Sequence, residues 1–413
     1  MSAVPSSLPL PQPAVRPRRR LLLAVVTLAM VPLSGYVAVL GVFRDVLQGY
    51  FGVTLNAFGL LLSIGLIPGA ISGVAAGAAI SRWGPRAVLR TALAGSAAAM
   101  ALTAATGRCW GLMLAAVALH GVFTQAVVIA ASAYLVQLFE TRPRRIMSLC
   151  MVAGSLGGIL FPLLAEWLLA VVDGGDFALA LHLPFCIVGL LLAAGWPAYA
   201  ARFSPVADVD APPPDPARPD RWWRFSPAGL MLIALCSLHG VCDSGAFAWM
   251  PRVLGGRSYA ELVFRPGHVM AAAALAYVVS RNLLALLPER LGASALLVGP
   301  GLLGGAAMTA GLLTRSQTWT AVGYVAAALL FSCEYPAMLA VLADIEKRRF
   351  GAAYGLIALV TGTLGFVLVC AMGWIGTAVG EQRLWLIMLL PAAGFPLVGL
   401  GGLLWLIRYG RRR

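Results

Sequence analysis

The sequence predicts an all-α polytopic membrane protein, and three observations lead to that prediction. Of its 413 residues 60% are hydrophobic and only 11% are charged, whereas soluble proteins carry about 25% charged residues. Apolar runs of about 20 residues recur along nearly the whole chain, each long enough to cross a hydrocarbon core of about 30 Å. These runs are continuously apolar and do not alternate with polar residues, which favours helices over a membrane barrel.

Twelve membrane-spanning helices are expected in chain order. They cover residues 21–42, 55–77, 88–107, 110–137, 147–171, 179–200, 227–249, 267–287, 294–314, 318–342, 352–376 and 384–407. The segment before the first helix is rich in proline and ends in arginines. Because no cleavage site follows the first apolar run, we interpret that run as an uncleaved span.

These twelve helices are expected to form two bundles of six. We assign residues 1–20 to a cytoplasmic tail, 21–200 to the first bundle, 201–226 to a polar cytoplasmic linker, 227–407 to the second bundle and 408–413 to a basic cytoplasmic tail. One constant offset aligns Gly154 and Gly157 of the first bundle with Gly362 and Gly365 of the second. Internal repeats of this kind are how many secondary transporters are built.

The net charge of +14 is explained by where the basic residues lie. Most of the 30 Lys and Arg residues fall in the two terminal segments and in the loops on the same side of the predicted membrane. This asymmetry follows the positive-inside rule and predicts that both termini are cytoplasmic. Contact with anionic membrane lipid is expected, whereas nucleic acid is not, since no soluble domain offers a basic face.

Further features narrow the location and the class of protein. The seven cysteines lie in or beside apolar runs without a C-x-x-C pair, which is typical of buried filler and not of disulfides. The nearly lysine-free composition indicates a GC-rich bacterial genome and hence the bacterial inner membrane, where we expect a monomer. The sequence lacks a phosphate-binding G-x-x-x-x-G-K-[ST] motif and a soluble domain, so we expect neither an enzyme nor a cofactor.

The turn between the second and third predicted spans reads GAAISRWGPRAVLR. Its Gly77, Arg82, Gly84 and Arg86 resemble the loop G-x-x-x-D-R-x-G-R-R of the major facilitator superfamily, with Ser81 in place of the aspartate. The resemblance covers about residues 20 to 408. It implies the family's fold of two six-helix bundles, and a loop that latches the bundles together in the outward-facing state.

The matching turn of the second half keeps an acidic–basic–glycine order in Glu289, Arg290 and Gly292. The alternative interpretation is that the arginines of both turns are topology signals only. The proline–glycine signature of drug/proton antiporters, G-x-x-x-G-P-x-x-G-G, is not matched near Gly154 and Pro162. Small-residue helix packing explains the glycines there, so import is favoured over drug efflux.

Candidate site residues are those that are costly to bury in a membrane. A charge at the bilayer centre costs about 2.5–3.5 kcal/mol on insertion scales, so such a residue normally faces a cavity or a partner. The deep candidates are His120, His239, Asp243, Arg281 and Glu334. The resemblance implies that spans 1, 4, 7 and 10 line a central cavity, and all of these except Arg281 lie on them.

His239 and Asp243 are predicted to share one helical face, since they are one turn apart. An imidazole titrates near neutrality and a poorly solvated carboxylate favours its neutral form, so the pair is a candidate for proton coupling. Glu334, followed by Tyr335 and a kink at Pro336, is the other candidate carboxylate. The open alternatives are a solvated Asp243, and structural roles for His239 and Glu334.

The remaining candidates have several open roles. Arg281 is interpreted as neutralising an anionic solute, as pairing with Glu334 or Asp243, or as extending towards the cytoplasmic interface. His120, Thr124 and Gln125, together with Tyr335, are candidate cavity residues that orient a solute or bridge helices.

A soft-metal site formed by Cys236, His239, Cys242 and Asp243 is set aside, because one helix does not aim four successive ligands at one ion. The sequence therefore predicts a secondary active transporter of a small organic solute that works by alternating access, with proton-coupled import (symport) as the favoured mode. The alternatives are drug or metabolite efflux by proton antiport, and a membrane sensor or scaffold that transports nothing.

Overall fold

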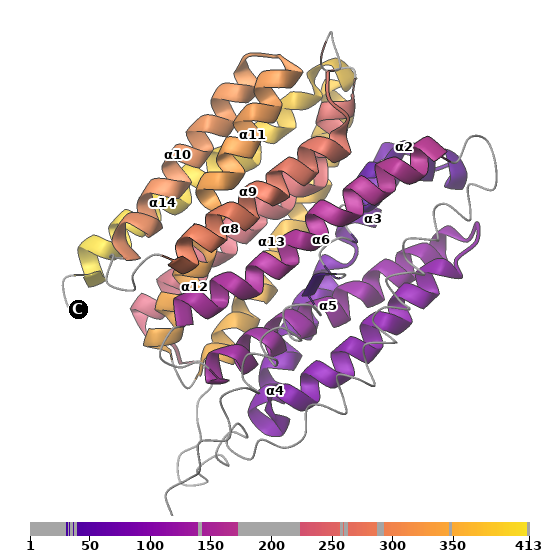
Figure 1. Cartoon of the computed structure of the whole chain (residues 1–413). Helices are drawn as coiled ribbons and strands as arrows, with labels where there is room; N and C mark the ends of the chain where they lie inside the picture. The colour runs from indigo at the N-terminus through magenta and orange to yellow at the C-terminus, as the bar shows by residue number, and fades with distance from the viewer. Residues whose placement is uncertain are drawn as a thin grey trace, which may run out of the picture.

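The chain is all-helical in the part that the structure describes. A computed structural model describes residues 30–31, 33, 36, 39–138, 143–171, 224–256, 259, 263–286, 293–346 and 349–410. Its helices are α2 (Arg44–Phe51), α3 (Leu55–Ser63), α4 (Leu66–Ala104), α5 (Trp110–Leu138), α6 (Pro143–Val171), α8 (Pro227–Gly255), α9 (Pro266–Leu286), α10 (Ala293–Leu313), α11 (Gln317–Phe331), α12 (Glu334–Ile345), α13 (Phe350–Val379), the 3-10 helix η2 (Glu381–Met388) and α14 (Leu389–Tyr409). The long helices run side by side along one common direction (Figure 1).

Ten helical stretches of the described residues are long and apolar enough to cross a membrane. They include Asn56–Ile80 and Arg82–Ala104, which α3 and α4 form, and Gln317–Ile345, which α11 and α12 form in succession. Large apolar side chains such as Leu286, Leu404 and Trp374 are exposed on the outside, 74%, 60% and 72% respectively. An apolar surface of this extent fits contact with lipid.

These ten spans agree with ten of the twelve predicted ones. The start of the third span differs from the prediction. This span begins at Arg82 and not at residue 88, because helical structure continues through the turn. Helical residues after the predicted first span also continue to Phe51, where a loop was expected. The sixth predicted span, most of the linker, the N-terminal tail and much of the first span lie outside the described residues.

Gly84 makes the bend between the two halves of α4. Its backbone has φ 76° and ψ 156°, while the residues on both sides are helical. This region of conformational space is essentially restricted to glycine. Pro85 follows directly, and the missing N–H of a proline is tolerated in the first turn of a helix. The bend therefore reverses the chain between two spans with almost no loop.

The most extensive contacts between the N-terminal half of the chain and the C-terminal half are made by two helix pairs. Helix α6 packs along α9, and α13 packs along α4, as the parallel course of α6 and α9 in Figure 1 illustrates. A Cβ atom on Gly362 of α13 would lie 2.5 Å from the Leu66 carbonyl oxygen of α4. Glycine is required at this position because the two backbones touch. The glycine repeats seen in the sequence thus lie on α6 and α13, which both contact the opposite half.

We predict that Gly84→Ala lowers the stability of the folded protein, since an alanine at φ 76° costs about 1–3 kcal/mol. Thermal unfolding in detergent measures the effect. The matched control is Gly111→Ala on α5, where an added Cβ meets nothing within 4 Å and alanine favours the helix. Equal unfolding temperatures for the two variants would contradict the role of Gly84.

Candidate functional site

A buried histidine–carboxylate pair lies inside the C-terminal half. His239 of α8 and Glu334 of α12 approach to 2.9 Å between Nδ1 and Oε2. Glu334 is 0% exposed and His239 is 3% exposed. The two residues are far apart in sequence, so only the packing of α12 against α8 brings them together. The pair is the most deeply buried ionisable contact among the described residues.

The position of Glu334 follows from a break in its span. Helix α11 ends at Phe331, a turn follows at Ser332 and Cys333, and α12 begins at Glu334 itself. The kink predicted at Pro336 therefore appears as a break just before it, which leaves the proline in the first turn of α12. A carboxylate in the first turn of a helix also benefits from the helix dipole.

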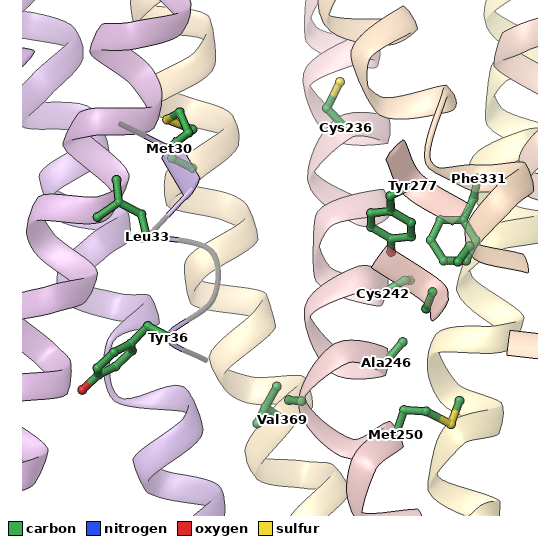
Figure 2. Packing of buried hydrophobic residues seen from close by; sticks show 14 of the residues in the cluster. Met30, Leu33, Tyr36, Cys236, Cys242, Ala246, Met250, Tyr277, Phe331 and Val369 are labelled. Carbon is green, nitrogen blue, oxygen red and sulfur yellow. The ribbon is translucent and has the colours of Figure 1, made fainter. Parts of the chain in front are cut away.

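Aromatic rings enclose the pair. The His239 ring lies 5.5 Å from the rings of Tyr335 and Phe395 and 5.8 Å from that of Phe331, centroid to centroid. Phe331 stacks on Phe395 at 4.0 Å. Figure 2 shows Phe331 beside Tyr277, next to the stretch of α8 that carries Cys236 and Cys242. A charge in such surroundings is costly unless a partner compensates it.

The second carboxylate oxygen of Glu334 does not share the contact with His239. Its Oε1 atom is buried and makes no hydrogen bond with the described residues. It faces the backbone of α10, where a Cβ on Gly301 would lie only 2.7 Å away. A buried carboxylate oxygen without a side-chain partner is costly while the group carries a charge.

Asp243 and Arg281 form a second polar group. The Tyr277 hydroxyl of α9 donates a hydrogen bond to Oδ1 of Asp243. The Arg281 guanidinium lies 4.8 Å from the centre of the same Tyr277 ring, in cation–π range. His239 and Asp243, predicted to act together on one face, thus have different partners, namely Glu334 and Tyr277.

Arg281 bonds across to the other half of the chain. Its NH1 group donates to the Met151 carbonyl oxygen at 2.8 Å and to the Ser155 hydroxyl at 2.7 Å, both on α6. Among the described residues it forms no ion pair with Glu334 or Asp243. In this conformation the side chain lies between α9 and α6, and its three predicted roles stay predictions.

The N-terminal half contains a neutral polar group. The His120 Nε2 atom is 3.1 Å from the Thr124 hydroxyl, and the His120 ring lies 4.1 Å from that of Tyr36. The Tyr36 hydroxyl in turn is 3.2 Å from that of Thr103. Gln125 lies elsewhere, with its Cγ atom against Gly73 of α4.

Sequence reasoning did not select Tyr36, Thr103, Ser155 or Tyr277. Hydroxyl groups are common in apolar helices and carry no spacing signal of their own, so only the tertiary contacts reveal their partners. The spacing of Tyr277 could have indicated its contact with Arg281, since it precedes Arg281 by one helical turn.

The predicted gating loop is partly described. A Cβ on Gly77 would lie 2.9 Å from the Gly351 carbonyl oxygen of α13, so this glycine lies at the contact between the halves. Arg82 is exposed, with its guanidinium 5.6 Å from the ring of Trp83, and Arg86 is partly buried. The matching residues of the second half, Glu289, Arg290 and Gly292, lie outside the described residues.

The metal alternative finds no geometric support. Across the described ranges, no three His, Cys, Asp or Glu side chains are grouped so that they could hold an ion. His239 and Asp243 are engaged by Glu334 and Tyr277, and Cys236 and Cys242 are buried free thiols.

Comparisons with known proteins agree with this architecture. The family model described as Major Facilitator Superfamily matches residues 22–267. The crystal structure of a variant of the E. coli fucose:proton symporter FucP is similar, with a TM-score of 0.70 and 14% identity over 94% of this chain and 99% of that one. A bacterial homologue of the human lysosomal transporter Spinster, inward-facing and occupied, gives a TM-score of 0.67 at 14% identity over 96% and 99%. No curated protein sequence matches the chain.

We predict that His239→Phe destabilises the protein more than Glu334→Gln does, because it leaves a carboxyl group buried without its partner. Breaking a buried pair from one side costs about 3–5 kcal/mol. The double variant should recover part of the loss, which a double-mutant cycle of thermal unfolding measures. Strictly additive effects would indicate that the two side chains do not interact. His120→Phe, which removes a ring bonded to a neutral hydroxyl, is the matched control.

Proposed function

Because the chain belongs to the Major Facilitator Superfamily, whose model matches residues 22–267, we propose that it is a proton-coupled secondary active transporter of a small organic solute. It moves the solute by alternating access, in which the two halves rock around a site between them. The observation that carries proton coupling is the buried contact between His239 and Glu334. One structural neighbour is named as a fucose:proton symporter, which makes the same coupling a reasonable proposal here.

The pair holds one exchangeable proton. With that proton bound, it is neutral overall, either as imidazole with carboxylic acid or as imidazolium with carboxylate. Release of the proton leaves one net negative charge among Phe331, Tyr335 and Phe395. Such a charge is costly in a closed apolar site, so the transporter changes its access with the proton bound and releases it when the site reaches water.

The remaining polar groups are assigned to binding of the solute. Tyr335 lies beside His239, while His120 and Thr124 offer hydrogen-bonding groups from the N-terminal half. We propose that the solute binds between these two sets and is imported together with the proton. Asp243, bonded to Tyr277, modifies the proton affinity of the pair from one helical turn away.

The proposed setting is the bacterial inner membrane, with both termini in the cytoplasm and the protein acting as a monomer. The excess of basic residues on one side supports this orientation. Under this proposal, the end of the bundle that contains Gly84 faces the cytoplasm, and the end that contains Asn56 faces outward.

We predict that Glu334→Gln keeps solute binding and exchange but loses accumulation driven by a proton gradient, since the amide mimics the protonated acid permanently. Uptake and counterflow in proteoliposomes with an imposed pH gradient separate the two activities. Asp243→Asn should give a milder shift in pH dependence. The matched control is Glu381→Gln, which changes a carboxylate that is paired with Arg252 and 47% exposed. Normal accumulation by Glu334→Gln would assign the proton to another group.

For orientation, we predict that a reporter active only in the cytoplasm functions when it is fused after Arg413 or inserted near Pro213. A cysteine placed near Gly174 should react with an impermeant thiol reagent added from outside. Reaction only from the cytoplasmic side would reverse the proposed topology.

A further inference from the structure

Polar side chains form hydrogen bonds between α6 and α9 near both ends of their contact. Near the Gly84 end, Arg281 of α9 donates to Met151 and Ser155 of α6. The Ser148 hydroxyl of α6 also donates to the backbone oxygen of Arg281. Near the Asn56 end, Glu166 of α6 accepts a hydrogen bond from the backbone N–H of Gly267, at 2.9 Å.

The Glu166 contact is a helix cap supplied by the other half of the chain. Helix α9 begins at Pro266, so the Gly267 N–H is one of the donors that a helix cannot satisfy internally. A carboxylate at this position also meets the positive end of the helix dipole. A Cβ on Gly267 would lie 2.4 Å from the Cγ atom of Glu166, so the approach requires glycine at that residue.

The Arg281 contact has the opposite arrangement, because α9 supplies the side chain and α6 supplies the acceptors. The guanidinium also lies over the Tyr277 ring, whose hydroxyl holds Asp243. The hydrogen-bonded pair of Asp243 and Tyr277 therefore lies directly beside Arg281, whose hydrogen bonds join the two halves.

We propose that Arg281 and Glu166 are two latches that close opposite ends of the α6–α9 contact, and that each conformational state of transport opens one of them. Both latches are closed in this structure. Opening the Gly84 end separates Arg281 from Ser155 and Met151, whereas opening the Asn56 end withdraws Glu166 from Gly267. The inference rests on the proposed function only in that the two halves move during transport.

The two latches differ in the free energy that is needed to open them. Release of Glu166 places a carboxylate and one backbone N–H near water at the end of a span, where both are solvated. Release of Arg281 leaves a half-buried guanidinium within a span that needs a new acceptor. The Gly84 end is therefore expected to open only when water or an anionic group of the solute replaces the α6 acceptors.

The test measures distances between spin labels by pulsed electron spin resonance, in a background in which the seven native cysteines are replaced. One pair of labels, at the exposed positions Ala87 and Leu286, reports on the Gly84 end. The other pair, at Gly111 and Leu313, reports on the Asn56 end. Each pair joins the N-terminal half to the C-terminal half.

We expect Ser155→Ala to increase the open population at the Gly84 end about tenfold, and Glu166→Ala to do so at the Asn56 end, as the loss of one hydrogen bond to a charged group implies. Gly267→Ala, which displaces Glu166 without altering it, should act as Glu166→Ala does. The matched controls keep their contacts within one half. Ser237→Ala removes a buried hydroxyl bonded to Ile233, and Glu381→Ala removes a carboxylate paired with Arg252. Neither control should change the distances.

The latch proposal is overturned if both variants leave the distances unchanged, or if each loosens both ends equally. These outcomes are independent of the proposed function. Failure of the parent protein to accumulate solute would overturn proton-coupled transport while the distances still report on the latches, and normal transport with unresponsive distances would overturn the latches alone.

Discussion

Inside a bilayer, a polar group must find its partner within the protein, because lipid offers neither donors nor acceptors. Backbone groups meet this constraint by forming helices, and the long helices of this chain follow from it directly. The few polar side chains must meet it through tertiary contacts. His239 bonds to Glu334, Asp243 to Tyr277, and Arg281 to α6, so most of the deep polar groups join two different helices.

The same constraint explains why the halves approach so closely. Without a hydrophobic driving force between helices in lipid, association depends on close packing and on hydrogen bonds. The α4–α13 contact relies on glycines such as Gly362, which bring backbones together. The α6–α9 contact relies more on Arg281 and Glu166, whose bonds are directional and can be exchanged for water.

Charge is balanced locally within the C-terminal half. Glu334 is matched by His239 in direct contact, and Asp243 lies near Arg281 with the Tyr277 ring between them. The first pair can change its charge by gaining or losing one proton, whereas an arginine is always protonated. The proposed proton coupling is therefore assigned to the histidine pair, and a permanent charge to Arg281.

The sequence by itself determined the all-helical class, ten of the span positions and the family. These depend on hydrophobicity and on local spacing, which are properties of consecutive residues. The sequence also identified Gly84 as part of a motif, but it did not predict the backbone conformation of this residue. Only the tertiary structure decided the partners: that His239 meets Glu334 and not Asp243, that Arg281 reaches α6, and that Glu166 caps α9. Such contacts join residues far apart in the chain, and no periodicity encodes which helices will become neighbours.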